Sequence, residues 1–142
     1  MRRTKLEERL GANLPRGTRQ VTLFIPEKDQ DGKPIDQNRW VEDALAMLGE
    51  LFRGATAFPP GEGVWRDDEK GGRLLREKTV MVTSYTNPAD HTDAALEALR
   101  AFLHRFGREA RQGEVGLVID DQYLGITRYE TGPSRRKGRG RR

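Results

Sequence analysis

The residues of this chain that could carry chemistry gather in one stretch, GATAFPPGEGVWRDDEKGG, which runs from residue 54 to residue 72. It places seven glycines and prolines around one tryptophan, Trp65, and it contains an acidic cluster near its end. Three structures suit such a stretch: a glycine-rich loop that binds phosphate, a carboxylate site for a metal ion, and the bend and turn of a β-hairpin. The choice among them decides whether an enzyme is to be expected.

The glycines of this stretch lack the context of a phosphate-binding loop. Neither GEG nor KGGR joins a strand to a helix with a terminal Gly-Lys-Ser/Thr, and neither has the spacing of a dinucleotide fingerprint. Carboxylates can bind Mg²⁺, but these fall in predicted turns, where acidic residues are favoured anyway. We therefore interpret the stretch as a hairpin and expect no catalytic residue, no metal site and no cofactor. The carboxylates concerned are Glu62, Asp67, Asp68, Glu69, Asp120 and Asp121.

The two histidines do not indicate a catalytic base. His91 falls in the first turn of a predicted helix, where the positive end of the helix dipole opposes its protonation. His104 belongs to a basic ridge on the same helix, with spacings of four, four and three residues. The ridge is either a solvated helix face, partly balanced by Glu97, or a surface that contacts phosphate. This arginine ridge consists of Arg100, His104, Arg108 and Arg111.

The net charge of +4 is divided unevenly along the chain. Residues 1–20 carry six basic and two acidic side chains, and residues 133–142 carry six basic and no acidic ones. The body, residues 21–132, carries 14 basic and 20 acidic side chains, a net charge of −6. The chain is thus an acidic body with two basic arms.

The C-terminal arm, PSRRKGRGRR, has no apolar residue, so we expect it to be disordered when free. Each basic side chain that neutralises a phosphate releases a condensed counterion, which gives salt-dependent, largely non-specific affinity for DNA or RNA. A solubilising tail is the alternative. The predicted nucleic-acid contacts are Arg135, Arg136, Lys137, Arg139, Arg141 and Arg142, together with the arginine ridge.

Length and composition predict one soluble domain. A chain of 142 residues can bury a core, and it has no cysteine for a disulfide, a thiolate zinc site or a nucleophile. No apolar run approaches the roughly 20 residues that span a bilayer, and the N-terminal segment lacks the apolar region of a signal peptide. We expect a cytoplasmic protein without membrane contact. Its predicted parts are a basic arm at 1–19, a single α+β domain at 20–130 and a disordered basic tail at 131–142.

Hydrophobic periodicity predicts the first half of the domain. Residues 20–25 (QVTLFI) alternate as a strand does. From Asp36 or Asn38 the period becomes helical, and Gly54 is expected to end this helix. ATAF is then a short strand, PPGEG a bend, VWR a continuation, and DDEKGG a turn into a long strand at 74–85.

The second half repeats this change of period. NPADHTDAALEALRAFLHRFG predicts a helix with Asn87 as N-cap, ending at Gly107 or Gly113, and two short strands, EVGLVID and YLGITRY, follow. The order of elements predicts the α+β class: a ferredoxin-like βαββαβ sheet with two helices on one face and an extra C-terminal strand. The predicted buried stripe of the second helix is Leu96, Leu99, Leu103 and Phe106.

Such a sheet leaves its second face uncovered. Phe24, Met81 and Tyr85 have the strand parity opposite to the predicted core residues, so we expect them on this face. Trp65, on the bent strand, is expected to pack in the core or in an interface. RNA-binding sheets stack bases on such aromatics, but the RNP motif is missing here. We therefore expect a homodimer through this face.

The segment GATAFPPGEGVWRDD resembles that of a group of small bacterial proteins of unknown function, which share a strand-bend-strand signature ending in Gly-x-Trp-Arg. In both, an amphipathic helix precedes the segment and a long apolar strand follows it. The resemblance covers residues 21–126 and leaves out both basic arms. It implies the ferredoxin-like fold and carries over no catalytic residue.

These features leave hypotheses from three classes. The first is a small, non-enzymatic nucleic-acid-binding or accessory regulatory module that uses its basic arms. The second is a protein-interaction subunit that docks a larger bacterial partner through the acidic body and the open sheet. The third is a ferredoxin-like enzyme or sensor that binds a small molecule near Trp65. The sequence indicates no particular reaction.

Overall fold

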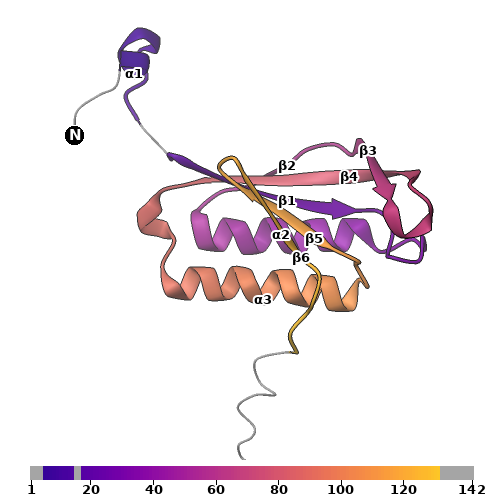
Figure 1. Cartoon of the computed structure of the whole chain (residues 1–142). Helices are drawn as coiled ribbons and strands as arrows, with labels where there is room; N and C mark the ends of the chain where they lie inside the picture. Colours follow the sequence, from indigo (N-terminus) through magenta and orange to yellow (C-terminus); the bar gives the residue numbers. More distant parts are fainter. Residues whose placement is uncertain (1–4, 15–16, 132–142) are drawn as a thin grey trace, which may run out of the picture.

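The computed structural model describes residues 5–14 and 17–131. It has the predicted α+β class: one antiparallel sheet of six strands, with α2 and α3 side by side on one of its faces (Figure 1). Residues 132–142, including Arg135, Arg136, Lys137, Arg139, Arg141 and Arg142 of the predicted tail, lie outside the described residues. The elements are α1 (Lys5–Leu10), β1 (Arg19–Pro26), α2 (Gln37–Phe52), β2 (Thr56–Ala57), β3 (Gly61–Asp67), the 3₁₀ turn η1 (Asp68–Lys70), β4 (Arg73–Thr86), the 3₁₀ turn η2 (Pro88–Asp90), α3 (Asp93–Glu109), β5 (Val115–Ile119) and β6 (Gln122–Ile126).

Strand β1 lies inside the sheet, between β4 and β5. The sheet order is β2-β4-β1-β5-β6, and β3 pairs with the other end of β4. Val21, Leu23 and Ile25 of β1 point to the helices and are at most 1% exposed. Because side chains alternate along a strand, Thr22 and Phe24 lie on the opposite face.

Helix α2 begins where the sequence predicts. The Asp36 side chain accepts a hydrogen bond from the Arg39 amide at 3.2 Å, which caps the helix. At the other end the helix stops just before Gly54, as expected, but the residue in the left-handed conformation is Arg53, with φ of 74°, and not the glycine. Its guanidinium pairs with Asp90 at 3.1 Å, which gives this strained residue a partner outside the helix.

Helix α3 begins later than the sequence predicts. Asn87 caps the separate turn η2, and Thr92 caps α3 by accepting from the Ala95 amide at 3.1 Å. His91 therefore lies between the two elements, where its ring stacks on Phe52 at 5.5 Å. The predicted stripe is also partly wrong, because Leu96 is 39% exposed. The buried residues of α3 are Ala95, Leu99, Phe102, Leu103, Phe106 and Gly107.

Beyond β6 the chain returns to the helical layer. Residues 127–131, which we call the C-terminal strap, place the Tyr129 ring against Gly107 of α3. A Cβ atom at position 107 would overlap this ring. The Tyr129 hydroxyl donates to the Gln112 carbonyl at 2.7 Å, and the ring meets His104 edge-on at 6.2 Å. Tyr129 thus anchors the strap.

This anchor predicts the effect of substituting two helical glycines. Gly107→Ala should lower the free energy of unfolding by about 1–3 kcal/mol, because the added methyl group displaces the Tyr129 ring. Gly49→Ala in α2 is the matched control, since an added Cβ there meets nothing within 4 Å. It should gain about 0.5–1 kcal/mol, as Ala generally does over Gly in a helix. Urea unfolding measures both.

A double-mutant cycle separates the clash from other effects. In a Tyr129→Ala background, Gly107→Ala should lose most of its cost because the overlapping ring is gone. Equal costs of Gly107→Ala in both backgrounds would contradict the anchor.

Candidate functional site

The uncovered face of the sheet holds a pocket of about 510 Å³. Strands β1, β3, β4, β5 and β6 supply its floor and walls, together with the loop after β1 and the turn after β3. We call it the sheet-face pocket. It is lined by Phe24, Pro26, Lys28, Asp29, Gln30, Asp31, Trp65, Asp67, Glu69, Lys70, Leu75, Glu77, Thr79, Gln112, Gly113, Glu114, Gly116 and Tyr123.

The β3–β4 hairpin places Trp65 beside Glu77. In its register Gly63 lies opposite Glu77, so Trp65, two residues further along the strand, lies on the same face. The Trp65 indole Nε1 donates to the Glu77 carboxylate at 3.0 Å. Burial raises the pKa of Glu77, and the hydrogen bond from Trp65 offsets part of that effect. The negative charge of Glu27 raises this pKa further.

On the other side of the pocket, Tyr123 is paired with Glu114. The Tyr123 hydroxyl donates to the Glu114 carboxylate at 2.9 Å. Burial, with a smaller contribution from Glu114, raises the pKa of Tyr123 to about 12. The phenol lies over Gly116 of β5, and a Cβ atom at that position would overlap it. The ring also meets Phe24 at 6.3 Å, which joins this wall to the centre of the sheet.

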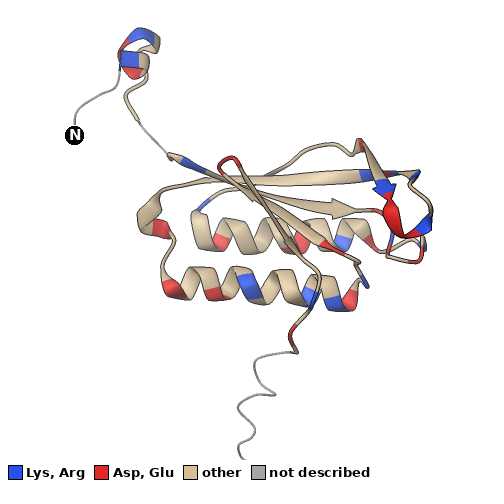
Figure 2. Ribbon diagram, in the orientation of Figure 1, with Lys and Arg blue, Asp and Glu red and all other residues tan. Residues whose placement is uncertain are grey.

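The pocket carries a negative charge. Its lining contains six carboxylates and two lysines, a formal net charge of −4. The acidic loop after β1 and the acidic turn η1 lie at the same end of the sheet (Figure 2). Arg111 pairs with Asp29 and Asp31, which neutralises part of the charge at the loop. The hydroxyl of Thr79 is buried in the lining and has no hydrogen-bond partner among the described residues.

This arrangement suits a small organic cation. Aromatic faces attract a cation through their quadrupole, and carboxylates attract it through their charge. Glu77 and Tyr123 both have raised pKa values and share one pocket, a combination that marks candidate functional sites. Among residues 5–14 and 17–131, no group of three or more histidines, cysteines and carboxylates is arranged to hold a metal ion.

The three residues expected on the uncovered face do lie there. Phe24 is opposite Met81 in the β1–β4 register, and Tyr85 is four residues further along β4, so all three share one face. Trp65, expected to pack, is 46% exposed and forms a wall of the pocket. The homodimer through this face stays a prediction.

Sequence reasoning missed three pocket residues: Glu77, Glu114 and Tyr123. Strand parity could have found Glu77. It is two residues from Thr79 and four from Met81 on β4, so it lies on the same uncovered face as Met81. The Glu114–Tyr123 pair depends on the hairpin register of β5 and β6, in which Gly116 lies opposite Gly125. A glycine opposite a glycine leaves the room that the two larger side chains occupy.

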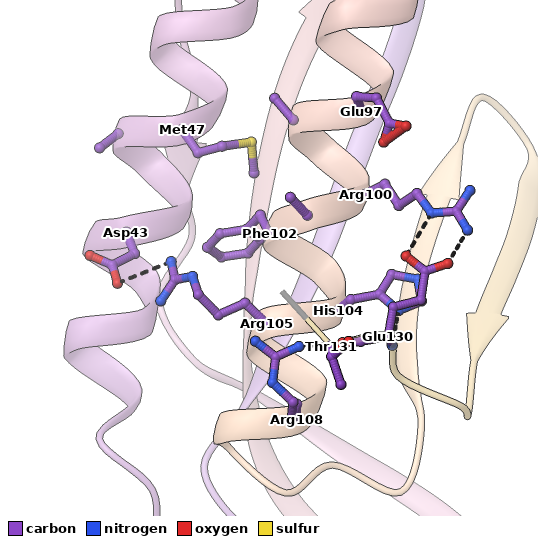
Figure 3. Close-up of a pocket in the computed structure, with 13 residues that line it drawn as sticks. Asp43, Met47, Glu97, Arg100, Phe102, His104, Arg105, Arg108, Glu130 and Thr131 are labelled. Carbon is purple, nitrogen blue, oxygen red and sulfur yellow. Dashed lines mark hydrogen bonds and ion pairs between the residues drawn. The ribbon is translucent and has the colours of Figure 1, made fainter. Parts of the chain in front are cut away.

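The arginine ridge does not form a bare helix face. Three of its members converge on Glu130 of the C-terminal strap (Figure 3). The fourth, Arg111, lies beyond the end of α3 and pairs instead with Asp29 and Asp31. The predicted ridge is therefore two separate clusters, and both are paired within the chain.

Beside this convergence lies a groove of about 810 Å³ along the outer side of α2 and α3. Met47 of α2 and Phe102 of α3 contribute its apolar part (Figure 3). Arg105 crosses between the helices and meets Asp43 at 3.8 Å. In the part of the chain that the structure describes, no helix is long and apolar enough to cross a membrane.

The chain superposes on several solved structures at low sequence identity. A phage SAM lyase in complex with S-methyl-5'-thioadenosine superposes with a TM-score of 0.60 at 17% identity, over 83% of this chain and 97% of that one. A phage SAM lyase in the apo state gives 0.57 at 16% identity, over 84% and 96%. CutA1 from Pyrococcus horikoshii OT3 gives 0.41 at 13% identity, over 82% and 89%.

No protein-family model and no curated protein matches the chain. The resemblance through the Gly-x-Trp-Arg signature therefore rests on those residues alone. The superposition on the phage lyases, at this level of identity, shows a shared small α+β fold.

The raised pKa of Glu77 predicts a pH-dependent stability. The folded state holds this proton more tightly than the unfolded state, so stability falls as the pH rises above the ordinary glutamate pKa toward the raised value. Glu77→Gln keeps an acceptor for the Trp65 indole and removes the ionisation. Its stability relative to the natural chain should therefore increase across this pH window. Urea unfolding at a series of pH values tests this, and parallel pH profiles of both proteins would contradict it.

Proposed function

We propose that the chain binds a small organic cation with an aromatic or apolar body in the sheet-face pocket. The observation that carries the proposal is the convergence of Trp65, Tyr123, Glu77 and Glu114 on one hollow of the open sheet. This is the small-molecule hypothesis among those that the sequence leaves open. The nucleic-acid hypothesis depends chiefly on residues outside the described ranges.

Size and chemistry support this choice. Pockets for small ligands commonly enclose about 300–1,000 Å³ and combine aromatic walls with a few polar groups. The sheet-face pocket has this size, with aromatic side chains from β1, β3 and β6. Ionised Glu77 and Glu114 would attract a cation, and the buried Thr79 hydroxyl can accept or donate one further hydrogen bond. An anion would face the negative lining.

The fold comparison supplies the first compound to test. The superposed phage enzyme is named a lyase of SAM, a molecule with a positively charged sulfonium, an adenine ring and an amino-acid group. SAM combines a cation with an aromatic body, as the pocket requires. S-methyl-5'-thioadenosine, the ligand of that phage enzyme, has the adenine ring but no sulfonium. The two compounds therefore differ in the positive charge that the pocket is proposed to bind.

Binding should therefore discriminate by charge. Isothermal titration calorimetry of the full chain should show SAM binding more tightly than S-methyl-5'-thioadenosine. Glu77→Gln should weaken SAM binding by roughly fivefold, the equivalent of about 1 kcal/mol for one cation-carboxylate contact, and leave the thioadenosine nearly unchanged. SAM affinity should rise with pH as Glu77 ionises.

Glu62→Gln is the matched control for this experiment. Glu62 lies on β3, opposite Lys78, with its side chain on the other face from Trp65. This substitution removes the same charge from the same hairpin and should leave both affinities unchanged. If neither compound binds, or if Glu62→Gln weakens SAM as much as Glu77→Gln does, the sheet-face pocket is not a cation site.

We also infer that the sheet belongs to the ferredoxin-like class. Support comes from the order of β1, α2, β3, β4, α3 and β5 and from the place of β1 between β4 and β5. Strand β6 is then the extra C-terminal strand, and β2 is a short addition beside β4. This class commonly leaves one sheet face free for ligands or partners.

Nucleic-acid binding through the basic arms is the second candidate function. The charge distribution favours it, since six basic and no acidic residues lie within 133–142. The acidic sheet-face pocket would take no part, because phosphates are repelled there. A solubilising role, or docking to a larger protein partner, is the alternative for these arms.

Removing residues 133–142 tests this candidate. The shortened chain should bind DNA and RNA more weakly, by a similar factor for every sequence, because backbone contacts carry no sequence information. The slope of log affinity against log salt should become shallower by about 0.7–0.9 for each phosphate group that the arm no longer neutralises. Filter binding at several salt concentrations measures both. A full chain that binds no nucleic acid at low salt would contradict this candidate and leave the arms a solubilising or partner-docking role.

A further inference from the structure

Glu130 of the C-terminal strap is held in the manner of a bound ligand. Both of its carboxylate oxygens accept from the Arg100 guanidinium, through Nε at 3.1 Å and through a terminal nitrogen. Arginine uses this two-pronged geometry to bind carboxylates and phosphates. The pair is accessible to solvent, with 57% of the Arg100 side chain and 39% of the Glu130 side chain exposed.

Two other side chains of α3 hold the backbone of the same residue. The Arg108 guanidinium donates to the Glu130 carbonyl oxygen, and the Glu130 amide donates to His104 Nδ1 at 2.9 Å. Figure 3 shows the three side chains reaching toward the strap from successive turns of α3. Spacings of four residues put them on one side of the helix. The carboxylate, the carbonyl and the amide of Glu130 therefore all meet this cluster.

The cluster is separate from the other arginine of the groove. Arg105 lies over the Trp40 ring at 4.9 Å and pairs with Asp43 and Glu109, so it helps to hold α2 against α3. Arg100 and Arg108, by contrast, both donate to the strap. If Glu130 leaves, two guanidinium groups face the solvent together. Exposed ion pairs of this kind are weak, so breaking the carboxylate pair costs little, but the hydrogen bonds of Arg108 and His104 to the Glu130 backbone must be exchanged as well.

We infer that Arg100, His104 and Arg108 form a phosphate-binding site on the outer side of α3, which Glu130 occupies as an internal ligand until a phosphate displaces it. A phosphoryl group suits the cluster better than the Glu130 carboxylate does, because it has more oxygens and a higher charge. The Glu130 carboxylate contacts Arg100, while Arg108 is left with a neutral carbonyl oxygen. A phosphate could engage both guanidinium groups with anionic oxygens.

The strap is built to release Glu130 without unfolding. Tyr129 is held independently of the arginines, by its packing on Gly107 and its hydrogen bond to the Gln112 carbonyl. Only residues 130 and 131 of the described chain need to move. The basic residues that follow in sequence are attached directly to this segment. Phosphate binding at the cluster would therefore move the two residues that precede the basic C-terminal arm in the sequence.

Competition by Glu130 can be measured with inorganic pyrophosphate as the probe. An internal ligand lowers the apparent affinity by the fraction of molecules in which it is bound. Glu130→Gln in the full chain should therefore bind pyrophosphate about fivefold more tightly than the natural chain, as expected for the removal of a weak competing ion pair. A chain with Arg100→Gln and Arg108→Gln should lose this gain. NMR titration should move the His104 ring signals and the Glu130 amide signal.

The matched control is Asp68→Asn. It removes the carboxylate from another exposed arginine pair, Arg66–Asp68, which is more open to solvent than Arg100–Glu130 and lies on the β3–β4 hairpin away from the cluster. Pyrophosphate affinity should not change. Glu130→Gln leaves residues 132–142 unchanged. If the arm alone bound pyrophosphate, the natural chain and Glu130→Gln would therefore have the same affinity, and that outcome overturns the inference.

Two further titrations identify the kind of molecule that supplies the phosphate. Inorganic phosphate and a single-stranded oligonucleotide are titrated into the same variants. A gain on Glu130→Gln that is larger for the oligonucleotide assigns the site to a nucleic-acid backbone, and a gain confined to pyrophosphate and phosphate assigns it to a small phosphate compound. No gain with any probe overturns the site.

Discussion

The fold depends on the burial of one face of β1. Val21, Leu23 and Ile25 are almost wholly inaccessible, and they lie where the two helices meet the sheet. Strands β4 and β5 pair with the two edges of β1, so its backbone groups are satisfied on both sides. A shift of register by one residue would turn the polar side chains of β1 into the core. This constraint fixes which residues of every neighbouring strand face the solvent.

The open face of the sheet takes its chemistry from that constraint. Phe24 must point away from the helices because its neighbours on β1 point toward them. The registers of β4 and β6 then bring Glu77 and Tyr123 to the same side. The helical face has a different chemistry, since arginines on α3 meet the strap there. The chain thus presents an acidic, aromatic hollow on one side and a basic cluster on the other.

Much of the fold could be predicted because its signals are local. The alternation of β1, the helical period of α2 and the two glycines after η1, both with positive φ, are readable within a few residues. The start of α3 could not be predicted in the same way, because Asn87 and Thr92 are both good caps in succession. Only packing decides which of them continues into the helix. The same holds for Leu96 and Phe102, whose burial depends on how α3 is rotated against α2.

The candidate sites were less predictable because they join residues far apart in sequence. Trp65 and Glu77 meet through a hairpin register, and Arg100 meets Glu130 across 30 residues. A helical wheel of α3 shows that the ridge residues lie on one side of the helix, but it cannot show that the C-terminal strap packs over them. The interpretation of the ridge as a continuous surface also failed at Arg111, because the helix ends before that residue. Strand parity correctly placed Phe24, Met81 and Tyr85 on the uncovered face of the sheet. The alternation of side chains can be followed along each strand without knowing which strand pairs with it.

Two glycines of the structure impose a rule on how the sequence can change. Each lies beneath an aromatic ring: Gly107 beneath Tyr129 and Gly116 beneath Tyr123. The glycine can gain a side chain only after the larger residue has shrunk, because the reverse order passes through an overlap. Evolutionary paths between related sequences are thereby ordered, with the shrinking of the large residue first. The positions therefore form coupled pairs, and each pair ties one turn of α3 or one strand of the β5–β6 hairpin to a candidate binding surface.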